Sequence, residues 1–262
     1  MDQREKGERF RALHEGDPFV LPNPWDVGAA RVLQSLGFPA LATTSSGFAW
    51  TLGRRDGEAG LGEVVEHVRE VADATEVPLS VDLEHGHGPR PEDTARAIER
   101  VAEAGAAGGS IEDWDPAGKR IYDLEEATER VACAVEAARG VGFPFTLTAR
   151  AENLLHGNDD LDDTIARLQA YERAGADVVY APGLRSADQV RAVCDAVNKP
   201  VNVLAHTGLH RDEIFAAGAQ RISVGGALAW AAYGALHDAA VRIRDDGDFS
   251  MLRGPRMDEW LG

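Results

Sequence analysis

The stretch with the densest chemistry in the sequence is PLSVDLEHGHG, residues 78–88. It begins as an apolar run and then places two carboxylates, two histidines and two glycines close together: Asp82, Glu84, His85, Gly86, His87 and Gly88. Four interpretations fit such a stretch: a zinc site, a magnesium site, a catalytic base or a solvated turn. The residues that end the other apolar runs help to choose among them.

Carboxylates recur where the next runs end. Glu112 closes the run in SIED, and Arg150 and Glu152 close PFTLTARAE. Alternation along a strand points Asp82 and Glu84 the same way. Three crowded carboxylates repel one another unless a cation lies among them, and oxygen ligands without cysteine favour Mg²⁺ or Mn²⁺. Arg150 can then hold a carboxylate through two hydrogen bonds.

Zinc is the main alternative metal, because His85 and His87 form an H-x-H pair. A zinc site needs a third strong ligand nearby, and the sequence has neither H-E-x-x-H nor a cysteine pair. We therefore expect His87 to contact substrate rather than metal. Other runs also end in polar or aromatic residues that we take as candidates for substrate binding: Trp25, Asp26, Ser45, Ser46, Gly47 and Asn202.

A scaffold must bring these run ends together. Eight short apolar runs recur along the chain, and seven of them follow a helix-like stretch. The runs cover residues 19–23, 39–45, 78–84, 108–113, 144–150, 177–183, 200–206 and 221–227. Strands that alternate with helices predict a parallel sheet. Eight such units in 262 residues match an α/β fold of the (β/α)₈ TIM-barrel type, whose active sites lie at the C-terminal ends of the strands.

An open doubly wound sheet is the alternative fold. That fold usually has a glycine-rich loop after the first strand. Here the first strand is followed by PNPWDVGAA, which has no such loop. We therefore expect a single barrel domain over residues 1–262. Residues 228–244 would form its last helix and residues 245–262 a C-terminal extension that is rich in apolar residues, namely Phe249, Met251, Leu252, Trp260 and Leu261. Such an extension either caps its own barrel or forms a subunit interface.

The overall composition excludes some classes of partner. The net charge is −17, which argues against nucleic acid or an anionic membrane surface and leaves a small anionic substrate open. Two cysteines, Cys133 and Cys194, argue against a disulfide framework and for a reducing compartment. The N-terminus has no apolar signal core, and no apolar run is long enough to cross a bilayer. We expect a cytoplasmic protein.

An ordered set of segments resembles the isocitrate lyase/phosphoenolpyruvate mutase superfamily over about residues 19–236. The segments are LPNPWDVGAA, ATTSSGFAWTLGRRDG, VDLEHGHG, SIED, TARAE, PVNVLA and RISVGGALA. The resemblance implies a Mg²⁺-dependent barrel that acts on 2-oxo acids through an enolate. It also implies a homo-oligomer, a dimer or tetramer, in which the last helix is swapped between subunits.

The resemblance also assigns roles to residues. It implies metal-binding roles for Asp82, Glu84, Glu112 and, in the stretch LGRRD, Asp56. The Arg150–Glu152 pair, Trp25 and Asp26 match substrate-site positions of the family. The backbone of Ser45, Ser46 and Gly47 matches the turn that grips the substrate carboxylate. Two substitutions depart from the family pattern: Glu84 replaces an aspartate and His87 replaces an aromatic residue.

The loop at residues 114–122 departs most from the family pattern. Isocitrate and methylisocitrate lyases carry K-[KR]-C-G-H there, whereas this chain has WDPAGKRIY, without cysteine or histidine. The lysine and asparagine-serine of phosphoenolpyruvate mutases are also absent. We expect this loop to close over the site, with Lys119, Arg120 and Tyr122 as candidates on it and Lys119 and Tyr122 as candidate catalytic residues beside Arg150.

The predicted function is a Mg²⁺-dependent C–C lyase or decarboxylase that acts on a 2-oxo acid or its precursor. Three alternatives stay open. They are a phosphonate P–C mutase or hydrolase, a non-catalytic barrel that retains the metal site, and a zinc hydrolase that uses His85 and His87.

Overall fold

Eight parallel strands form the centre of the molecule. The computed structural model describes residues 1–252, 254 and 258. The strands of the main sheet are β1 (Phe19–Leu21), β2 (Leu41–Ala42), β3 (Leu79–Asp82), β4 (Gly108–Glu112), β7 (Thr146–Arg150), β8 (Val178–Tyr180), β9 (Val201–Leu204) and β10 (Arg221–Ser223). Each lies within one of the eight apolar runs, so the predicted strands are confirmed.

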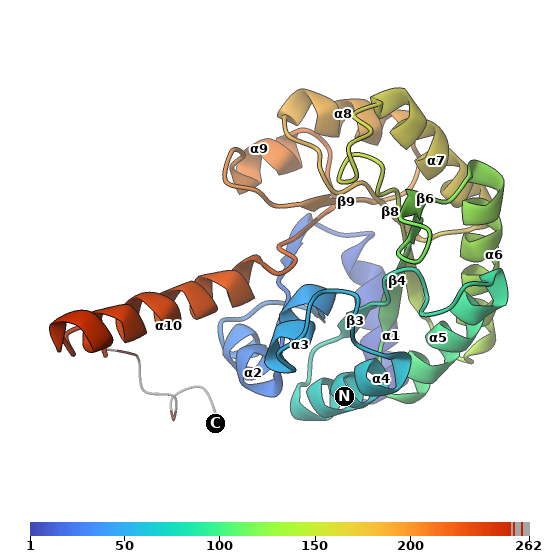
Figure 1. Cartoon of the computed structure of the whole chain (residues 1–262). Coiled ribbons are helices and arrows are strands. Elements are labelled where there is room, and N and C mark those ends of the chain that lie inside the picture. Colours follow the sequence, from blue (N-terminus) through green and yellow to red (C-terminus); the bar gives the residue numbers. More distant parts are fainter. Residues whose placement is uncertain (253, 255–257, 259–262) are drawn as a thin grey trace.

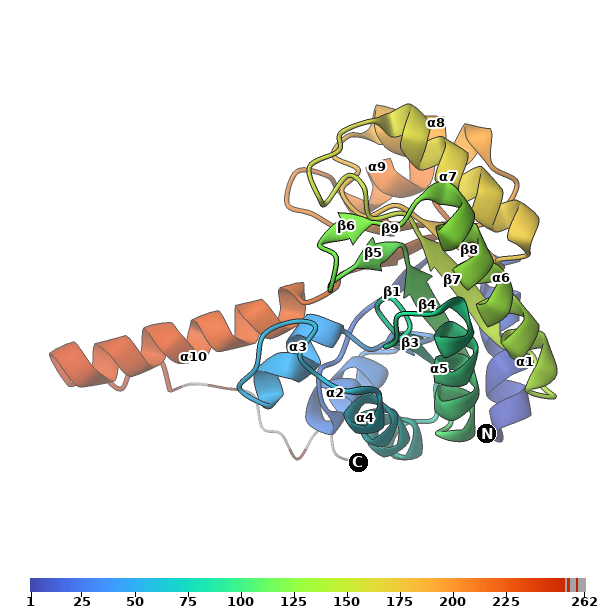
Figure 2. The same ribbon diagram turned by 45° about the vertical axis from the view of Figure 1, so that its right-hand side comes forward.

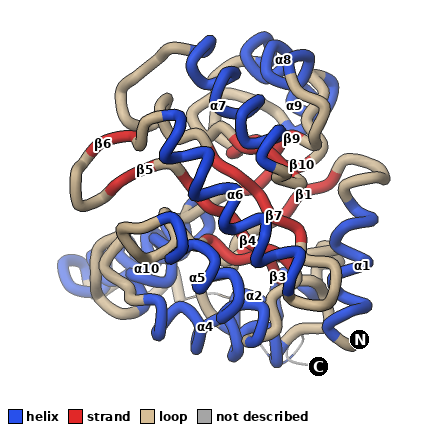
Figure 3. The backbone as a smooth tube through the Cα atoms, turned by 90° about the vertical axis from the view of Figure 1, so that its right-hand side faces the viewer, coloured by secondary structure: helices blue, strands red, loops and turns tan. Residues whose placement is uncertain are grey.

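The strands close into a barrel. Their order is β1-β10-β9-β8-β7-β4-β3-β2, and hydrogen-bonded neighbours in this sheet run parallel. The remaining gap, between β1 and β2, is bridged where the N–H of Ala42 donates to the carbonyl of Pro22 at 3.1 Å. The structure thus has the TIM-like barrel that the sequence predicts, and Figure 3 shows its strands enclosed by helices.

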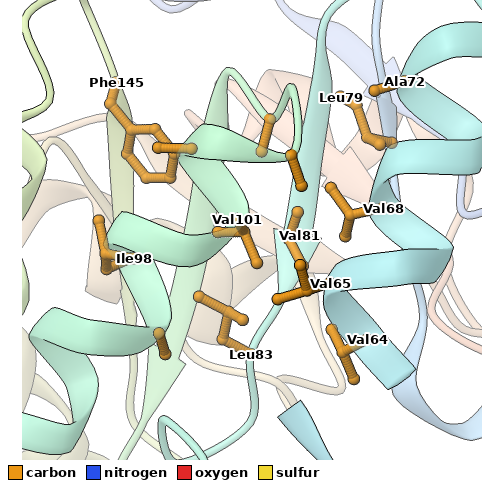
Figure 4. Close-up of a cluster of buried hydrophobic side chains, with 14 of the residues drawn as sticks. Val64, Val65, Val68, Ala72, Leu79, Val81, Leu83, Ile98, Val101 and Phe145 are labelled. Carbon is orange, nitrogen blue, oxygen red and sulfur yellow. The ribbon is translucent and has the colours of Figure 1, made fainter. Parts of the chain in front are cut away.

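Helices follow the strands and cover the outside of the barrel. They are α2 (Val27–Ser35), α3 (Ser45–Thr51), α4 (Leu61–Ala74), α5 (Pro91–Glu103), α6 (Leu124–Gly140), α7 (Leu161–Ala174), α8 (Ala187–Ala196) and α9 (Arg211–Ala216). Figure 1 shows α4 to α9 following one another around the sheet. The core lies between sheet and helices. In Figure 4, Val64, Val65 and Val68 of α4 point toward strand β3 and helix α5.

Helix α1 (Gln3–Leu13) closes the N-terminal end of the barrel. A side chain at Gly108, where β4 begins, would lie 2.7 Å from the ring of Phe10. The amide of Gln3 donates to the carbonyl of Ala106 at 3.2 Å. His14, which caps the end of α1, lies 3.1 Å from the Arg221 guanidinium at the start of β10. The floor of the barrel is therefore sealed by the chain's own first helix.

The last helix corrects one prediction. Residues 227–246 do form a helix, α10 (Ala227–Asp246), but it projects away from the barrel instead of packing on it (Figures 1 and 2). Ala229 is its one buried residue in the described part of the chain, whereas the side chains of Leu228, Trp230 and Leu236 are exposed. The predicted helix is therefore confirmed, whereas its expected packing as the last helix of its own barrel is wrong.

Beyond α10, the side chains of Phe249, Met251 and Leu252 are also exposed, so they do not cap their own barrel. Trp260 and Leu261 lie outside the described residues. In the described part of the chain, each helix is too short or too polar to cross a membrane.

The predicted closing loop is a two-stranded hairpin. Strands β5 (Trp114–Asp115) and β6 (Arg120–Ile121) pair antiparallel directly after β4, and Figure 2 shows them beyond the end of β4. The ring of Trp114 stacks on His156 at 3.5 Å between centroids. This contact holds the hairpin against the loop that follows β7.

Candidate active site

A cavity of about 140 Å³ lies at the C-terminal ends of the strands and continues into the barrel. We call the C-terminal ends of the eight strands the rim. At the rim the cavity is lined by Ser45, Ser46, Asp56, Asp82 and Arg150. Toward the floor it is lined by Ser80, Asn202 and Arg221, which lie nearer the starts of their strands. The predicted convergence of strand ends is therefore present in the structure.

Arg150 is the centre of this rim. Its guanidinium lies 2.8 Å from Asp82 at the end of β3 and 3.1 Å from Glu112 at the end of β4. It lies 2.9 Å from Glu152, two residues further along its own chain segment. Its face lies over the ring of Tyr180, 5.2 Å from the centroid. Three charge-assisted contacts thus fix the arginine in one orientation.

Carboxyl groups outnumber cationic groups around this arginine. Burial, together with the nearby carboxylates of Asp82 and Asp56, raises the pKa of Glu84 from 4.5 to about 8. Burial also raises the pKa of Glu112 well above its ordinary value, although Arg150 opposes the rise. For Glu152, burial raises the pKa to about 7. One guanidinium does not neutralise this group, and a bound cation would lower these raised pKa values.

The turn that begins α3 supplies backbone donors at the rim. The N–H of Ser45 donates to Asp82 at 3.3 Å, and the hydroxyl of Thr44 caps the helix by accepting from the N–H of Gly47 at 3.4 Å. A Cβ at Gly47 would lie 2.7 Å from Thr44 and 2.9 Å from Trp25. Glycine is therefore required at this position by close packing.

The turn after β3 has an unusual backbone. Glu84 and His87 both have positive φ, at 50° and 55°, a conformation that costs energy in non-glycine residues and clusters at functional sites. Arg130 on α6 holds this turn, because its guanidinium donates to the carbonyls of His85, Gly88 and Pro89. No acidic partner of Arg130 is found among the described residues, so its charge is balanced by backbone dipoles.

The histidines of the turn lie beside the rim. His87 Nδ1 is 3.7 Å from Glu84 Oε2, and the buried Nε2 of His87 has no hydrogen-bond partner within the described part of the chain. His85 and His87 line a neighbouring cavity under the hairpin instead of the central one. The predicted contact of His87 with substrate stays a prediction.

The donor set suits a hard cation bound partly through water. Across the residues that the structure describes, no three His, Cys, Asp or Glu side chains form a ready-made ligand group. Zinc takes direct protein ligands, and zinc on His85 and His87 stays an untested alternative. Mg²⁺ keeps several waters. Asp82, Glu84, Glu112 and Asp56 would then hold it through a few direct contacts and bridging water.

Several predicted residues lie away from the central cavity. Asp26 is exposed and caps α2 by accepting from the N–H of Ala29 at 2.6 Å, and Trp25 packs near Gly47. Lys119 is exposed on the hairpin with φ of 50°. The ring of Tyr122 is buried, 4.5 Å from the guanidinium carbon of Arg130. None of these four lines the cavity, and a catalytic role for Lys119 or Tyr122 stays a prediction.

The structure adds three residues to the predicted set. Asn23 accepts from the N–H groups of Val224 and Gly225 at 2.9 and 3.0 Å, which joins β1 to the turn after β10. Tyr180 lies beneath Arg150. Arg221 donates to the predicted site residue Asn202 at 2.8 Å. The polar type of Asn23 and its place at a strand end were visible in the sequence, but its use as a backbone clamp was not.

The closed α/β barrel is an enzyme scaffold whose active site lies at the C-terminal ends of the strands, and in this chain those ends carry carboxyl groups around Arg150. Comparison with known families makes the class specific, because residues 10–244 match the phosphoenolpyruvate phosphomutase family. The chain therefore belongs to the phosphoenolpyruvate mutase/isocitrate lyase superfamily, as its motifs predicted.

Individual relatives cover nearly the whole chain. Oxaloacetate decarboxylase from Bradyrhizobium diazoefficiens is 30% identical over 96% of this chain and 89% of its own length. A Burkholderia cenocepacia J2315 protein, provisionally assigned as a lyase or mutase, is 50% identical with a TM-score of 0.94, over 98% of this chain and 95% of that one.

A third relative has been solved with small acids bound. Oxaloacetate acetylhydrolase in complex with its product oxalate is 29% identical with a TM-score of 0.88, over 100% of this chain and 96% of that one. A structure of oxaloacetate acetylhydrolase with the inhibitor 3,3-difluorooxaloacetate is 28% identical.

Proposed function

We propose that this protein is a Mg²⁺-dependent enzyme, with Mn²⁺ as a possible substitute, that acts on a 2-oxo acid or its precursor through an enolate. The reaction we favour is C–C cleavage or decarboxylation. The observation that carries the proposal is the contact of Arg150 with Asp82, Glu112 and Glu152 beside the Ser45 N–H. At the rim, the cavity of about 140 Å³ is thus lined by the cationic side chain of Arg150 and by the carboxyl groups of Asp82 and Asp56.

Each part of the rim has a task in this proposal. Asp82, with Glu84, Glu112 and Asp56, would hold the cation. When bound, the cation supplies a Lewis acid for the oxygen on which negative charge develops. Arg150 and the N–H groups at the start of α3 bind the remaining substrate oxygens. The hairpin of β5 and β6 excludes water from the enolate.

Phosphonate chemistry is the second candidate, and the match to the phosphoenolpyruvate phosphomutase family favours it. A mutase or P–C hydrolase would use the same cation and the same arginine. The hairpin sequence WDPAGKRIY differs from the lysine and asparagine-serine pattern of the mutases, and for this reason we rank C–C chemistry first. Parallel assays of oxaloacetate and phosphonopyruvate separate the two.

The test measures Mg²⁺-dependent release of pyruvate or CO₂ from a panel of 2-oxo and 2-hydroxy acids. Asp82→Asn should lower kcat/KM by at least about 100-fold, because the side chain contacts Arg150 and, in this proposal, also holds the cation. Asp159→Asn, which changes an exposed carboxylate, is the matched control. Wild-type protein that binds Mg²⁺ but turns over none of these acids would support a non-catalytic barrel instead.

We also propose that α10 mediates self-association into a dimer or tetramer. Its exposed apolar residues, Leu228, Trp230 and Leu236, support this, as does the exposed Trp50 of α3 beside its base, whose ring lies 6.3 Å from that of Trp230. Exposed apolar surface of this kind is a usual mark of protein interfaces. A helix that projects from its own barrel is available to another copy (Figure 1).

A further inference from the structure

Arg221 is a buried cation that the proposed chemistry does not use. It is the first residue of β10, its side chain is 3% exposed, and it lines the floor of the central cavity. Its guanidinium donates to Asn202 Oδ1 at 2.8 Å and Thr148 Oγ1 at 3.0 Å, and Nη1 lies 3.1 Å from His14 Nε2. These contacts come from β9, β7 and the residue that caps the end of α1, so the guanidinium is held by three separate parts of the chain.

All three partners are neutral. Burial and the charge of Arg221 lower the pKa of His14 to about 3, so this imidazole is uncharged at neutral pH. Its Nδ1 lies 2.8 Å from the carbonyl of Phe10, which fixes the proton there and leaves Nε2 to accept from Arg221. Within the described residues no carboxylate pairs with Arg221, and burial lowers the arginine's pKa only to about 10, so it stays charged.

A buried charge without a counter-ion is costly. A guanidinium has five N–H donors, and the described contacts use one on each nitrogen. One N–H on each terminal nitrogen therefore remains for a ligand. Two N–H donors on neighbouring guanidinium nitrogens can bind the two oxygens of a carboxylate.

The barrel interior around Arg221 is polar where barrels of this type are usually filled by bulky aliphatic side chains. Ser80, Ser110, Asn202 and Ser223 line the cavity from four different strands. The cavity of about 140 Å³ equals roughly four or five water molecules at ~30 Å³ each, which suits a small acid. The space, the donors and the unpaired charge thus occur together.

We propose that Arg221 binds a carboxylate group inside the barrel, and that this carboxylate is the second anionic group of a dicarboxylic 2-oxo acid. The identity of the ligand as substrate rests on the proposed function, whereas the anion site itself does not. A separate monocarboxylate is the other source of the same chemistry. Arg221 would then select diacids over monoacids, while Arg150 and the cation hold the reacting end.

Isothermal titration calorimetry with three probes tests this. The probes are oxalate with Mg²⁺ for the rim alone, 3,3-difluorooxaloacetate with Mg²⁺ for rim and floor, and formate for the floor alone. Arg221→Met should weaken 3,3-difluorooxaloacetate binding by at least about tenfold and leave oxalate unchanged. Arg173→Met, which removes an exposed arginine, should change neither.

The outcomes separate the sources and the hypotheses. If Arg221→Met loses formate binding but binds oxalate and 3,3-difluorooxaloacetate as wild type does, the site is supported with a free monocarboxylate as its ligand. Failure of oxalate to bind wild-type protein contradicts the proposed function, and formate still tests Arg221. Should Arg221→Met not fold, Arg221→Lys retains the charge without the fork and should lower the diacid-to-oxalate affinity ratio. Unchanged binding of all probes in the folded variant would overturn the inference.

Discussion

Glu84→Gln should stabilise the metal-free protein at neutral pH, although it removes a candidate metal ligand. The Glu84 side chain is 13% exposed, and its pKa rises from 4.5 to about 8 because of burial and the nearby Asp82 and Asp56. A raised pKa means that the folded state favours the protonated carboxyl. The stability that this group contributes is complete below pH 4.5 and is lost as pH rises toward 8.

The magnitude follows from the pKa. Each pH unit between the two values corresponds to ~1.4 kcal/mol, so the raised pKa of Glu84 lowers the free energy of unfolding by ~3 kcal/mol at pH 7 and ~4 kcal/mol at pH 8. Glutamine keeps the shape without the charge. The stability difference between Glu84→Gln and wild type should grow from about zero at pH 4.5 to ~3 kcal/mol at pH 7.

Urea unfolding in EDTA at pH 5, 6, 7 and 8 measures this difference, with slopes compared to confirm that the same surface unfolds. Glu70→Gln, an exposed change on α4, is the control and should track wild type at every pH. Mg²⁺ should stabilise wild type at pH 8 more than it stabilises Glu84→Gln. Parallel stability curves for wild type and Glu84→Gln across the whole range would refute the reasoning.

Two further predictions concern the turn after β3 and the last helix. Arg130→Met leaves three carbonyls without their donor and should cost ~3 kcal/mol or more in urea unfolding. The same variant should weaken Mg²⁺ binding in calorimetry, and unchanged Mg²⁺ affinity would contradict a positioning role for Arg130. Leu236→Glu should reduce the mass measured by sedimentation velocity, whereas Leu36→Glu, equally exposed at 64% at the end of α2, should not. A monomeric wild type would exclude self-association through α10.

The barrel could be predicted because its signal is local. Each buried strand reads as a short apolar run, and each connecting helix has its own periodicity, so eight repeats define the architecture. The failure at α10 has an equally clear cause. Periodicity predicts a helix over residues 228–244, and the structure has one over Ala227–Asp246. A helix with exposed Leu228, Trp230 and Leu236 carries no local signal for the surface it will contact.

The rim was predictable to a similar degree. Asp82, Glu112 and Arg150 end adjacent strands, and registry pairs Glu112 directly with Arg150, so strand order alone brings them together. Arg221 was not predictable as a site residue, because it begins its strand and therefore belongs to the floor. Its role depends on His14, 207 positions away in the sequence, and no local pattern reports such a contact.

A crystal structure of the protein with Mg²⁺ and oxalate tests the central claim most directly. The account predicts Mg²⁺ beside Asp82, with Glu84, Glu112 and Asp56 contacting it directly or through water. It also predicts oxalate oxygens on Mg²⁺, Arg150 and the backbone N–H groups that begin α3. Metal on His85 and His87, or oxalate bound away from Arg150, would contradict it.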